Sequence, residues 1–453
     1  MAEQKAVMVY GAGISGRGAA EVLVQQNKRV YLYNDTACQL DAALLQKLEA
    51  SCGGFVCGTA SFEELLPQVE LIVLSPGVPA DCENVLLAEQ SGVEVISEVE
   101  LGYRLFGGHI AAITGTNGKT TTTTLVGEML KRLSVPSAVG GNIGLALSKE
   151  VEQLPENGWL AAELSSFQLE KVQSFCPDIA VVLNLTPDHL ERHHTMKAYG
   201  DAKKRIFTQQ GPQQVTVLNY DDPEVRSWAD ESKGQICFFS RKEELENGIF
   251  MQNGDFVIKW KNETFKVCNI KEMHLFGGHN EENVLAAIAC GFFAGVSIAD
   301  IADVLRNFRS IEHRLEYVKT IKGVPYYNDS KATNTDSTVK ALEAFENGHI
   351  ILLAGGHDKL TPLEPMMEVI KEKVDTLILL GEARERFNAA AVACSVPHIM
   401  LADSFEEAVN MAYKLAQPPQ VVLLSPACSS FDMFKNYPER GRCFKNLVQG
   451  LAE

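Results

Sequence analysis

The sequence predicts an α/β protein of three domains, each built on a mostly parallel sheet. Apolar segments of strand length alternate with helical segments along the whole chain, which is typical of doubly wound sheets. Most of these strands run into a glycine-rich or polar loop. The 453 residues also exceed the ~250–300 at which a single core stops growing. We therefore expect domains over residues 1–97, 98–310 and 311–453.

The composition is that of a globular enzyme rather than a disordered or fibrous chain, with 46% hydrophobic and 22% charged residues. A formal net charge of -17 disfavours binding to nucleic acid or to an anionic membrane surface. The 11 cysteines show no paired metal-ligand spacing, and no apolar run approaches the ~18 residues of a membrane span. We expect a cytoplasmic monomer with reduced thiols and no membrane insertion.

The first domain is predicted to be Rossmann-like. A strand at residues 6–10 enters Gly11-Ala12-Gly13-Ile14-Ser15-Gly16 and a helix, and a second strand at residues 29–33 leads to Asp35. A G-x-G-x-x-G turn with an acidic residue about 20 positions on is the fingerprint of a diphosphate-binding unit. A further strand at residues 69–74 runs into Ser75-Pro76-Gly77. Taken alone, this domain leaves an NAD-dependent dehydrogenase open.

The second domain is predicted to be an α/β domain of the P-loop type that binds a nucleoside triphosphate. A strand at residues 109–113 enters Gly115-Thr116-Asn117-Gly118-Lys119-Thr120 and then a helix. In such a turn the backbone N–H groups face phosphate, Lys119 supplies a positive charge and the Thr120 hydroxyl can bind Mg²⁺. The match to G-x-x-x-x-G-K-[ST] lacks its first glycine, because Ile113 holds that position.

Polar residues with metal-binding capacity follow the next two strands, predicted at residues 158–162 and 179–183. Glu163 ends the first of them, where a carboxylate can bind Mg²⁺. Asp188-His189 follows the second, and such a pair either serves a metal or caps a helix beside a half-buried imidazole. Lys203 lies in a predicted helix, where most lysines are solvated surface charges.

The last third is predicted to be another Rossmann-like α/β domain. Its strands each stop at a polar or glycine-rich loop, and they lie at residues 325–327, 349–354, 376–381 and 420–424. Ahead of it, shorter strand-like segments over residues 236–267 indicate a small antiparallel insertion in the second domain.

Together, the motifs of all three domains resemble those of the Mur ligase superfamily, in order along essentially the whole chain. The resemblance rests on Gly11 to Gly16, Ser75-Pro76-Gly77, Gly115 to Thr120, Gly141-Asn142-Ile143-Gly144, Glu163 to Gln168, Asp188-His189, Lys203, His313-Arg314, Asp329 to Thr333, and Ser425 to Asp432. It implies a peptidoglycan-precursor ligase that uses ATP to activate a carboxylate as an acyl phosphate. The implied substrates are UDP-N-acetylmuramoyl-L-alanine and D-glutamate, with two Mg²⁺ ions for which Mn²⁺ can substitute.

The resemblance also implies roles for individual residues. The catalytic residues would be Lys119, His189, Asn142 and Lys203, the last carbamylated. The metal ligands would be Thr120, Glu163, His189 and Lys203. ATP would contact Gly115, Thr116, Asn117, Gly118, Lys119, Thr120, Thr121, Asn280, Asn283, Arg314 and Asp329. The first domain would hold UDP rather than NAD, and the substrate contacts would be Ile14, Ser15, Asp35, Thr36, Ser75, Gly77, Asn142, Ser165, Lys331, Thr333, Lys359, Ser430 and Phe431.

Three departures from the usual family pattern affect the amino-acid pocket and the surroundings of the metal. His357-Asp358 replaces an acidic or small pair, Tyr437 stands where Phe is common, and Glu191 stands where Asp is common. Alternatives are a sister ligase that adds another amino acid and a folylpolyglutamate-type synthetase. A non-catalytic nucleotide-binding regulator is the alternative from another class.

Overall fold

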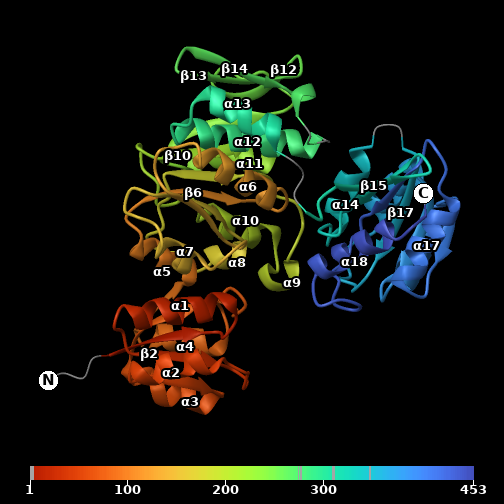
Figure 1. Ribbon diagram of the computed structural model, residues 1–453. Coiled ribbons are helices and arrows are strands. Elements are labelled where there is room, and N and C mark those ends of the chain that lie inside the picture. Colours follow the sequence, from red (N-terminus) through yellow and green to blue (C-terminus); the bar gives the residue numbers. More distant parts are fainter. Residues whose placement is uncertain (1–4, 274, 276–277, 309–311, 346–347, 453) are drawn as a thin grey trace. The chain divides into compact units, whose positions relative to one another are not determined.

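The computed structural model describes residues 5–273, 275, 278–308, 312–345 and 348–452. The chain forms three sheets and divides into two compact units (Figure 1). The first unit holds Met1–Glu272 with Glu282–Arg306, and the second holds Met273–Glu281 with Asn307–Glu453. The expected α/β architecture is confirmed, and the predicted strands lie within two residues of observed ones. The residues at which the three domains meet stay a prediction.

The first sheet is parallel and has apolar clusters on both of its faces. Its elements are β1 (Ala6–Tyr10), α1 (Ile14–Gln25), β2 (Val30–Asn34), α2 (Ala42–Ala50), β3 (Gly54–Cys57), α3 (Thr59–Leu65), η1 (Leu66–Gln68), β4 (Val69–Leu74), α4 (Glu83–Gln90) and β5 (Glu94–Ser97). The strand order β3-β2-β1-β4-β5 reverses beside β1, so ligands are expected at the carboxyl ends of β1 and β4. A Cβ on Gly16 would lie 1.8 Å from the Gly11 carbonyl oxygen, so α1 can approach β1 only with glycine there.

The second sheet has nine strands in the order β14-β13-β12-β11-β10-β9-β6-β8-β7. Its elements, with the helices between them, are β6 (His109–Thr114), α6 (Lys119–Leu130), β7 (Ser137–Gly141), α7 (Leu147–Val151), β8 (Trp159–Glu163), α8 (Ser166–Leu169), β9 (Ile179–Val182), α9 (Leu190–His193), α10 (Met196–Lys204), β10 (Val215–Asn219), α11 (Pro223–Ser227), η2 (Trp228–Glu231), β11 (Gln235–Ser240), β12 (Gly248–Gln252), β13 (Asp255–Trp260), β14 (Glu263–Asn269), η3 (Ile270–Glu272), α12 (Gly278–Phe293) and α13 (Ile298–Asn307).

The predicted antiparallel segment is smaller than expected and extends this sheet. Only β12, β13 and β14 pair antiparallel, whereas β11 pairs parallel with both β10 and β12. The reason for the difference at β11 is that α11 and η2 carry the chain back along the sheet after β10. Antiparallel pairing then begins at the tight turn between β12 and β13.

The third sheet follows the order β15-β16-β20-β17-β18-β19 and is parallel except for the first pair. Apolar clusters cover both faces, and all six residues of β17 are buried. Its elements are β15 (Glu316–Ile321), β16 (Val324–Asn328), α14 (Thr335–Glu343), β17 (Ile350–Gly355), α15 (Glu364–Lys373), β18 (Val374–Leu380), α16 (Arg384–Ala393), β19 (Ile399–Leu401), α17 (Phe405–Leu415), β20 (Val421–Leu424) and α18 (Tyr437–Gln449). Among the helices in the described part of the chain, none combines the length and the apolar character needed to cross a membrane.

Helix α5 (Glu98–Leu105) joins the first two sheets through buried carboxylates. Glu98 accepts hydrogen bonds from the backbone N–H, at 2.7 Å, and the hydroxyl of Ser148 on α7. Glu100 has a fully buried side chain that accepts from the backbone N–H groups of Gln173, Ser174 and Phe175 and pairs with Arg104. These bonds attach the helix that leaves the first sheet to α7 and to the loop ahead of β9 in the second domain.

We predict that Glu100→Ala destabilises the first unit by about 2–3 kcal/mol, because it leaves the buried N–H of Phe175 and the neighbouring N–H groups of Gln173 and Ser174 without their acceptor. All three tryptophans, Trp159, Trp228 and Trp260, lie in this unit, so urea unfolding followed by fluorescence reports on it. Glu94→Ala removes only an exposed partner of Arg104 and should cost less than about 1 kcal/mol. Equal unfolding curves for the two variants would contradict the role given to Glu100.

Candidate active site

The predicted phosphate loop is a tight turn between β6 and α6. Gly115 and Gly118 have φ of +151° and +87°, and a Cβ on Gly118 would lie 2.0 Å from Asn283 Oδ1. Both positions therefore require glycine. Lys119 Nζ bends back over the turn and donates to the carbonyl oxygens of Gly115, at 2.9 Å, and Thr116, at 2.8 Å. The loop thus has the strand-turn-helix context that phosphate binding needs.

Asn184, which the sequence reasoning did not single out, braces this loop. It follows β9, and its Oδ1 accepts from the backbone N–H groups of Thr116, at 3.1 Å, and Asn117, at 2.8 Å. Its Nδ2 returns a bond to the Asn117 carbonyl at 3.2 Å. An amide directly after a strand that neighbours the phosphate loop was the available sequence signal. These three hydrogen bonds explain how an irregular turn keeps one conformation.

Glu163 ends β8, the strand beside β6, and its carboxylate is buried at 2% exposure. Oε1 accepts a bond from Asn142 Nδ2 at 2.8 Å, so two predicted site residues are in direct contact. Oε2 is buried and has no hydrogen-bond partner within the described residues. A buried carboxylate oxygen without a donor suits a cation, and oxygen is the ligand that Mg²⁺ prefers. Thr120, in the first turn of α6, is a buried residue as well.

Lys203 is not the solvated surface lysine that its sequence context favours, because its side chain on α10 is only 1% exposed. Its Nζ donates to the Gly115 carbonyl at 2.8 Å and lies 4.4 Å from the ring centre of Tyr199. Burial, followed by the nearby charge of Lys119, holds the pKa of Lys203 well below its ordinary value. The fold therefore brings Lys203 and Lys119 to the same carbonyl oxygen.

His189 forms the N-cap of the short helix α9 with φ of +54° and gives that helix no side-chain cap bond. Its imidazole lies between the carboxylates of Asp188 and Glu191, with N–O distances of 3.6 and 3.5 Å. Its ring centre is 6.5 Å from that of Tyr199, the residue that also contacts Lys203. The imidazole is thus half-buried, at 38% exposure, and its role in binding a metal stays a prediction.

The predicted substrate residues of the first domain lie after β1, β2 and β4. Asp35 is exposed and accepts a bond from the Tyr10 hydroxyl at 2.6 Å. Ser75 is buried and donates to the Gly11 carbonyl at 2.7 Å, so the loops after β1 and β4 are joined. Of the other members at the same edge, Ile14, Thr36 and Gly77 are exposed and Ser15 is half-buried. Ser165, from the second domain, has its hydroxyl engaged in a capping box with Gln168.

Of the predicted nucleotide contacts beyond the loop, Asn280, Asn283 and Asp329 are buried and Arg314 is half-buried. Asn283 on α12 lies 3.5 Å from the Thr122 hydroxyl, and Asn280 precedes it by one turn of the same helix. In the second unit, burial raises the pKa of Asp329 to about 7, although the Ser425 hydroxyl donates to it at 2.8 Å. Arg314 Nε is buried without a hydrogen-bond partner in the part of the chain that the structure describes.

The predicted amino-acid residues follow three neighbouring strands of the third sheet. Lys331 and Thr333 follow β16, Ser430 and Phe431 follow β20, and Lys359 follows β17. Because these strands are parallel, the three loops emerge at one edge of the sheet.

Arg440, which the sequence reasoning also did not single out, joins two of these loops from within. Its guanidinium is 1% exposed and donates to the carbonyl oxygens of Ser330, Cys428 and Ser429 at 2.8, 3.0 and 3.2 Å. Burial lowers the pKa of Arg440 to about 10, which leaves it charged at neutral pH. Its Nε also donates to the Ser330 hydroxyl at 3.0 Å. Only the fold reveals these contacts, because most of the partners are backbone carbonyls.

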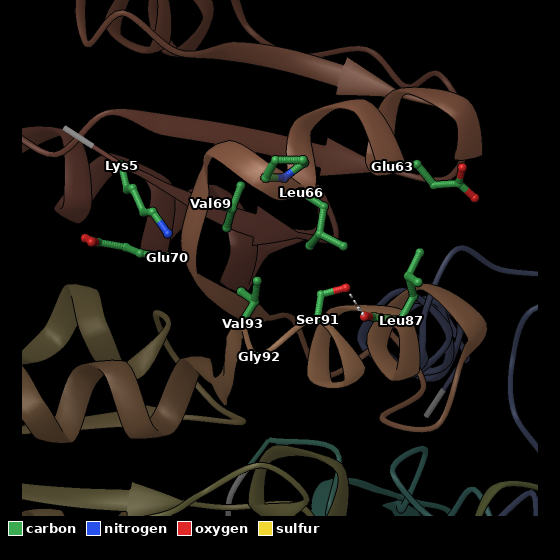
Figure 2. A pocket seen from close by; sticks show the side chains of 10 residues that line it. Lys5, Glu63, Leu66, Val69, Glu70, Leu87, Ser91, Gly92 and Val93 are labelled. Atoms are coloured by element: carbon green, nitrogen blue, oxygen red, sulfur yellow. Dashed lines mark hydrogen bonds between the residues drawn. The ribbon is translucent and has the colours of Figure 1, made fainter. Parts of the chain in front are cut away.

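Two other features of the structure contain none of the predicted site residues. A hollow of about 560 Å³ lies where β4 and β5 begin, at the opposite edge of the first sheet from Ser75 (Figure 2). Its lining residues are Lys5, Glu63, Leu66, Pro67, Val69, Glu70, Leu87, Ser91, Gly92 and Val93. In the second unit, Glu312, His313 and Glu316 come close enough to share a metal. Lys445 Nζ already pairs with both of these carboxylates.

Models of three Mur ligase domain families match the chain. The MurD-like N-terminal domain matches residues 5–97, the Mur ligase middle domain residues 113–291, and the glutamate ligase domain of Mur ligases residues 313–428.

Relatives that match the chain over its full length point to the same family. The chain is 42% identical over 449 residues to a UDP-N-acetylmuramoylalanine--D-glutamate ligase of Thermoanaerobacter sp. (strain X514), covering 99% of this chain and 98% of that protein. It is 43% identical over 448 residues to the protein of that name from Desulfitobacterium hafniense (strain DSM 10664 / DCB-2), with the same shares covered.

Solved structures share the fold. A pseudomurein peptide ligase type C from Methanothermus fervidus gives a TM-score of 0.62 at 16% identity, covering 98% of this chain and 99% of that one. MurF from Acinetobacter baumannii gives 0.61 at 20% identity, covering 88% of each chain. With all three domain matches and these full-length relatives, the chain belongs to the Mur ligase family.

Proposed function

We propose that this chain is an ATP-dependent ligase that adds D-glutamate to UDP-N-acetylmuramoyl-L-alanine and forms ADP and phosphate in peptidoglycan precursor synthesis. The observation that carries the proposal is the phosphate loop, where Lys119 and Lys203 converge on the Gly115 carbonyl beside the buried carboxylate of Glu163. Full-length relatives of this name, 42–43% identical to the chain, support the choice of substrates.

In the proposed reaction, the terminal L-alanine carboxylate attacks the γ-phosphate of ATP, and ADP leaves. The resulting acyl phosphate is attacked at its carbonyl carbon by the amine of D-glutamate, which loses a proton as phosphate departs. Positioning and charge neutralisation dominate phosphoryl transfer. Lys119 neutralises charge on the transferring group, and Asn142, bonded to Glu163, lies where it can orient the substrate beside the phosphates.

The described residues fit two Mg²⁺ ions, for which Mn²⁺ can substitute. Thr120 and Glu163 would hold the first, and the unpaired buried Oε2 of Glu163 is the observation that supports it. His189 would hold the second together with Lys203, after the neutral Lys203 amine adds to CO₂ and loses a proton to become a carbamate. Burial favours the neutral amine that this addition needs. Bound Mg²⁺ neutralises phosphate charge and orients the phosphates.

The remaining predicted residues take their proposed roles from the family resemblance, and most of them lie near strand ends, whereas Asn280 and Asn283 lie on α12. Ile14, Ser15, Asp35, Thr36, Ser75 and Gly77 would hold UDP, while Asn280, Asn283, Arg314 and Asp329 would hold the nucleotide. Lys331, Thr333, Lys359, Ser430 and Phe431 would receive D-glutamate. A cytoplasmic monomer is proposed as well, and light scattering of the purified protein tests its mass.

Phosphate release from ATP tests the function directly. The purified protein with Mg²⁺ receives UDP-N-acetylmuramoyl-L-alanine together with D-glutamate, L-glutamate, L-alanine or L-lysine. We expect release only when both the UDP substrate and D-glutamate are present. Stimulation by another amino acid would identify a sister ligase, and nucleotide binding without any release would identify a regulator.

We predict that Lys119→Ala and Glu163→Ala each lower turnover by roughly 10²–10³, because each removes an electrostatic partner of the phosphates. Steady-state phosphate release measures the loss, and circular dichroism checks that the fold is kept. Lys131→Ala is the matched control, since this exposed lysine at the end of α6 pairs only with Glu128 among the contacts seen. Wild-type turnover in either site variant would overturn its assignment.

We predict that Lys203→Ala loses ligation and is partly rescued by short carboxylates such as acetate, which can replace the carbamate in the cavity that the side chain leaves. The adjacent Lys204→Ala should keep wild-type turnover, because Lys204 pairs with Asp201 and Glu231 at the surface. Mass spectrometry under CO₂ that finds no carbamate, together with no rescue, would exclude the proposed modification.

A further inference from the structure

The loop that carries Lys359 is attached to α16 by a bidentate ion pair. Arg386 donates from Nε to Asp358 Oδ2 and from Nη2 to Asp358 Oδ1, both at 2.6 Å. Its third nitrogen, Nη1, donates to the Thr361 carbonyl at 3.1 Å. One guanidinium therefore holds the residue before Lys359 and a carbonyl two residues after it. A planar, bidentate arrangement fixes orientation as well as distance.

The same carboxylate shapes the backbone next to Lys359. Asp358 Oδ1 also accepts from the Leu360 N–H at 2.9 Å. Leu360 has φ of +55° and is 78% exposed, so it adopts an uncommon backbone conformation without packing to hold it. Such a conformation persists only where its neighbours determine it. Here the determining contacts come from Asp358 and, through Thr361, from Arg386.

The other end of the loop is joined to the neighbouring loops of the same edge. The His357 N–H donates to the Ser429 carbonyl at 2.9 Å, which places the loop after β17 beside Ser430 and Phe431. The His357 imidazole lies 2.7 Å from Glu382 Oε2, and the Glu382 N–H donates to Asp432 at 3.1 Å. The backbone of Lys359 is thus held on both sides.

The pair is more protected from solvent than an ordinary surface salt bridge. The Asp358 side chain is 12% exposed and that of Arg386 is 35% exposed, whereas Arg384, on the same helix, pairs with an Asp403 that is 89% exposed. Hydrogen bonding from Arg386 keeps the pKa of the Asp358 carboxyl below its usual range. Both groups therefore stay charged at neutral pH.

We propose that the Asp358–Arg386 pair positions Lys359 to bind a carboxylate of the incoming amino acid, and thereby determines the affinity of the enzyme for that substrate. The inference rests on the proposed function and deepens it. Lys359 is exposed, and its ammonium matches an anionic group. A flexible lysine recognises such a group with useful selectivity only if its backbone is held.

The test compares Arg386→Ala with Arg384→Ala in the intact protein. We expect Arg386→Ala to raise the KM for D-glutamate about tenfold, with kcat at saturating D-glutamate and the KM values for ATP and the UDP substrate within about twofold. Arg384→Ala removes an ion pair from the same helix without touching the loop, and should leave all four parameters unchanged. Arg386→Lys keeps the charge but not the bidentate geometry, so its KM for D-glutamate should lie between those of wild type and Arg386→Ala.

Asp358→Asn and the double variant complete the experiment. If the two residues act as a unit, the double variant raises the KM for D-glutamate no further than either single change. Hydrogen exchange supplies a readout without substrate: the Leu360 amide should exchange faster in Arg386→Ala and Asp358→Asn, and not in Arg384→Ala.

An unchanged KM for D-glutamate, or an equal rise in all three KM values, would overturn the positioning role. The wild-type assay separates this failure from that of the function. If wild type responds to a different amino acid, the same KM split is expected for that amino acid and the positioning role stands. If no amino acid stimulates wild type, the proposed function fails and the inference fails with it.

Discussion

Two lysine side chains share the Gly115 carbonyl oxygen, and the proposed catalytic site is arranged around this contact. One lysine comes from the first turn of α6 and the other from α10, more than 80 residues later. Two cations so close, one of them fully buried, repel each other and lose hydration. The arrangement is stable with one amine neutral or with an anion nearby, and Asp188 is the carboxylate whose charge favours the charged form of Lys203.

Irregular loops at the strand ends are held by buried polar side chains rather than by regular structure. Asn184 makes hydrogen bonds to the phosphate loop, Arg440 to two loops of the third sheet, and Glu100 to the loop of the second sheet that leads into β9. Each bonds to backbone groups that would otherwise be buried without a partner. The loops can therefore carry functional side chains and still keep a defined conformation. The ion pair of Asp358 with Arg386 holds the loop of Lys359 in a similar way.

The parts of the fold that could be predicted were those with a strong local pattern. Strands of continuous apolar residues such as β1, β6 and β17 were located, as was the glycine turn of the phosphate loop. Shorter or less apolar strands such as β3 and β7 were not, because their pairing partners decide them. The parallel pairing of β11 was missed for a related reason. The residue pattern shows that a segment is a strand, but the path of the chain between two strands decides whether they run parallel or antiparallel.

By itself the sequence determined the order of the three α/β units, the glycines that the phosphate turn requires and the family to which the motifs belong. These follow from local chemistry, since glycine at positive φ and an apolar run between polar loops can be recognised without knowing any distant partner. Only the tertiary structure decided that Lys203 is buried, that Glu163 has an unpaired oxygen and that Arg386 holds the loop of Lys359. Burial and pairing depend on which distant segments pack together, and no local pattern of residues encodes that choice.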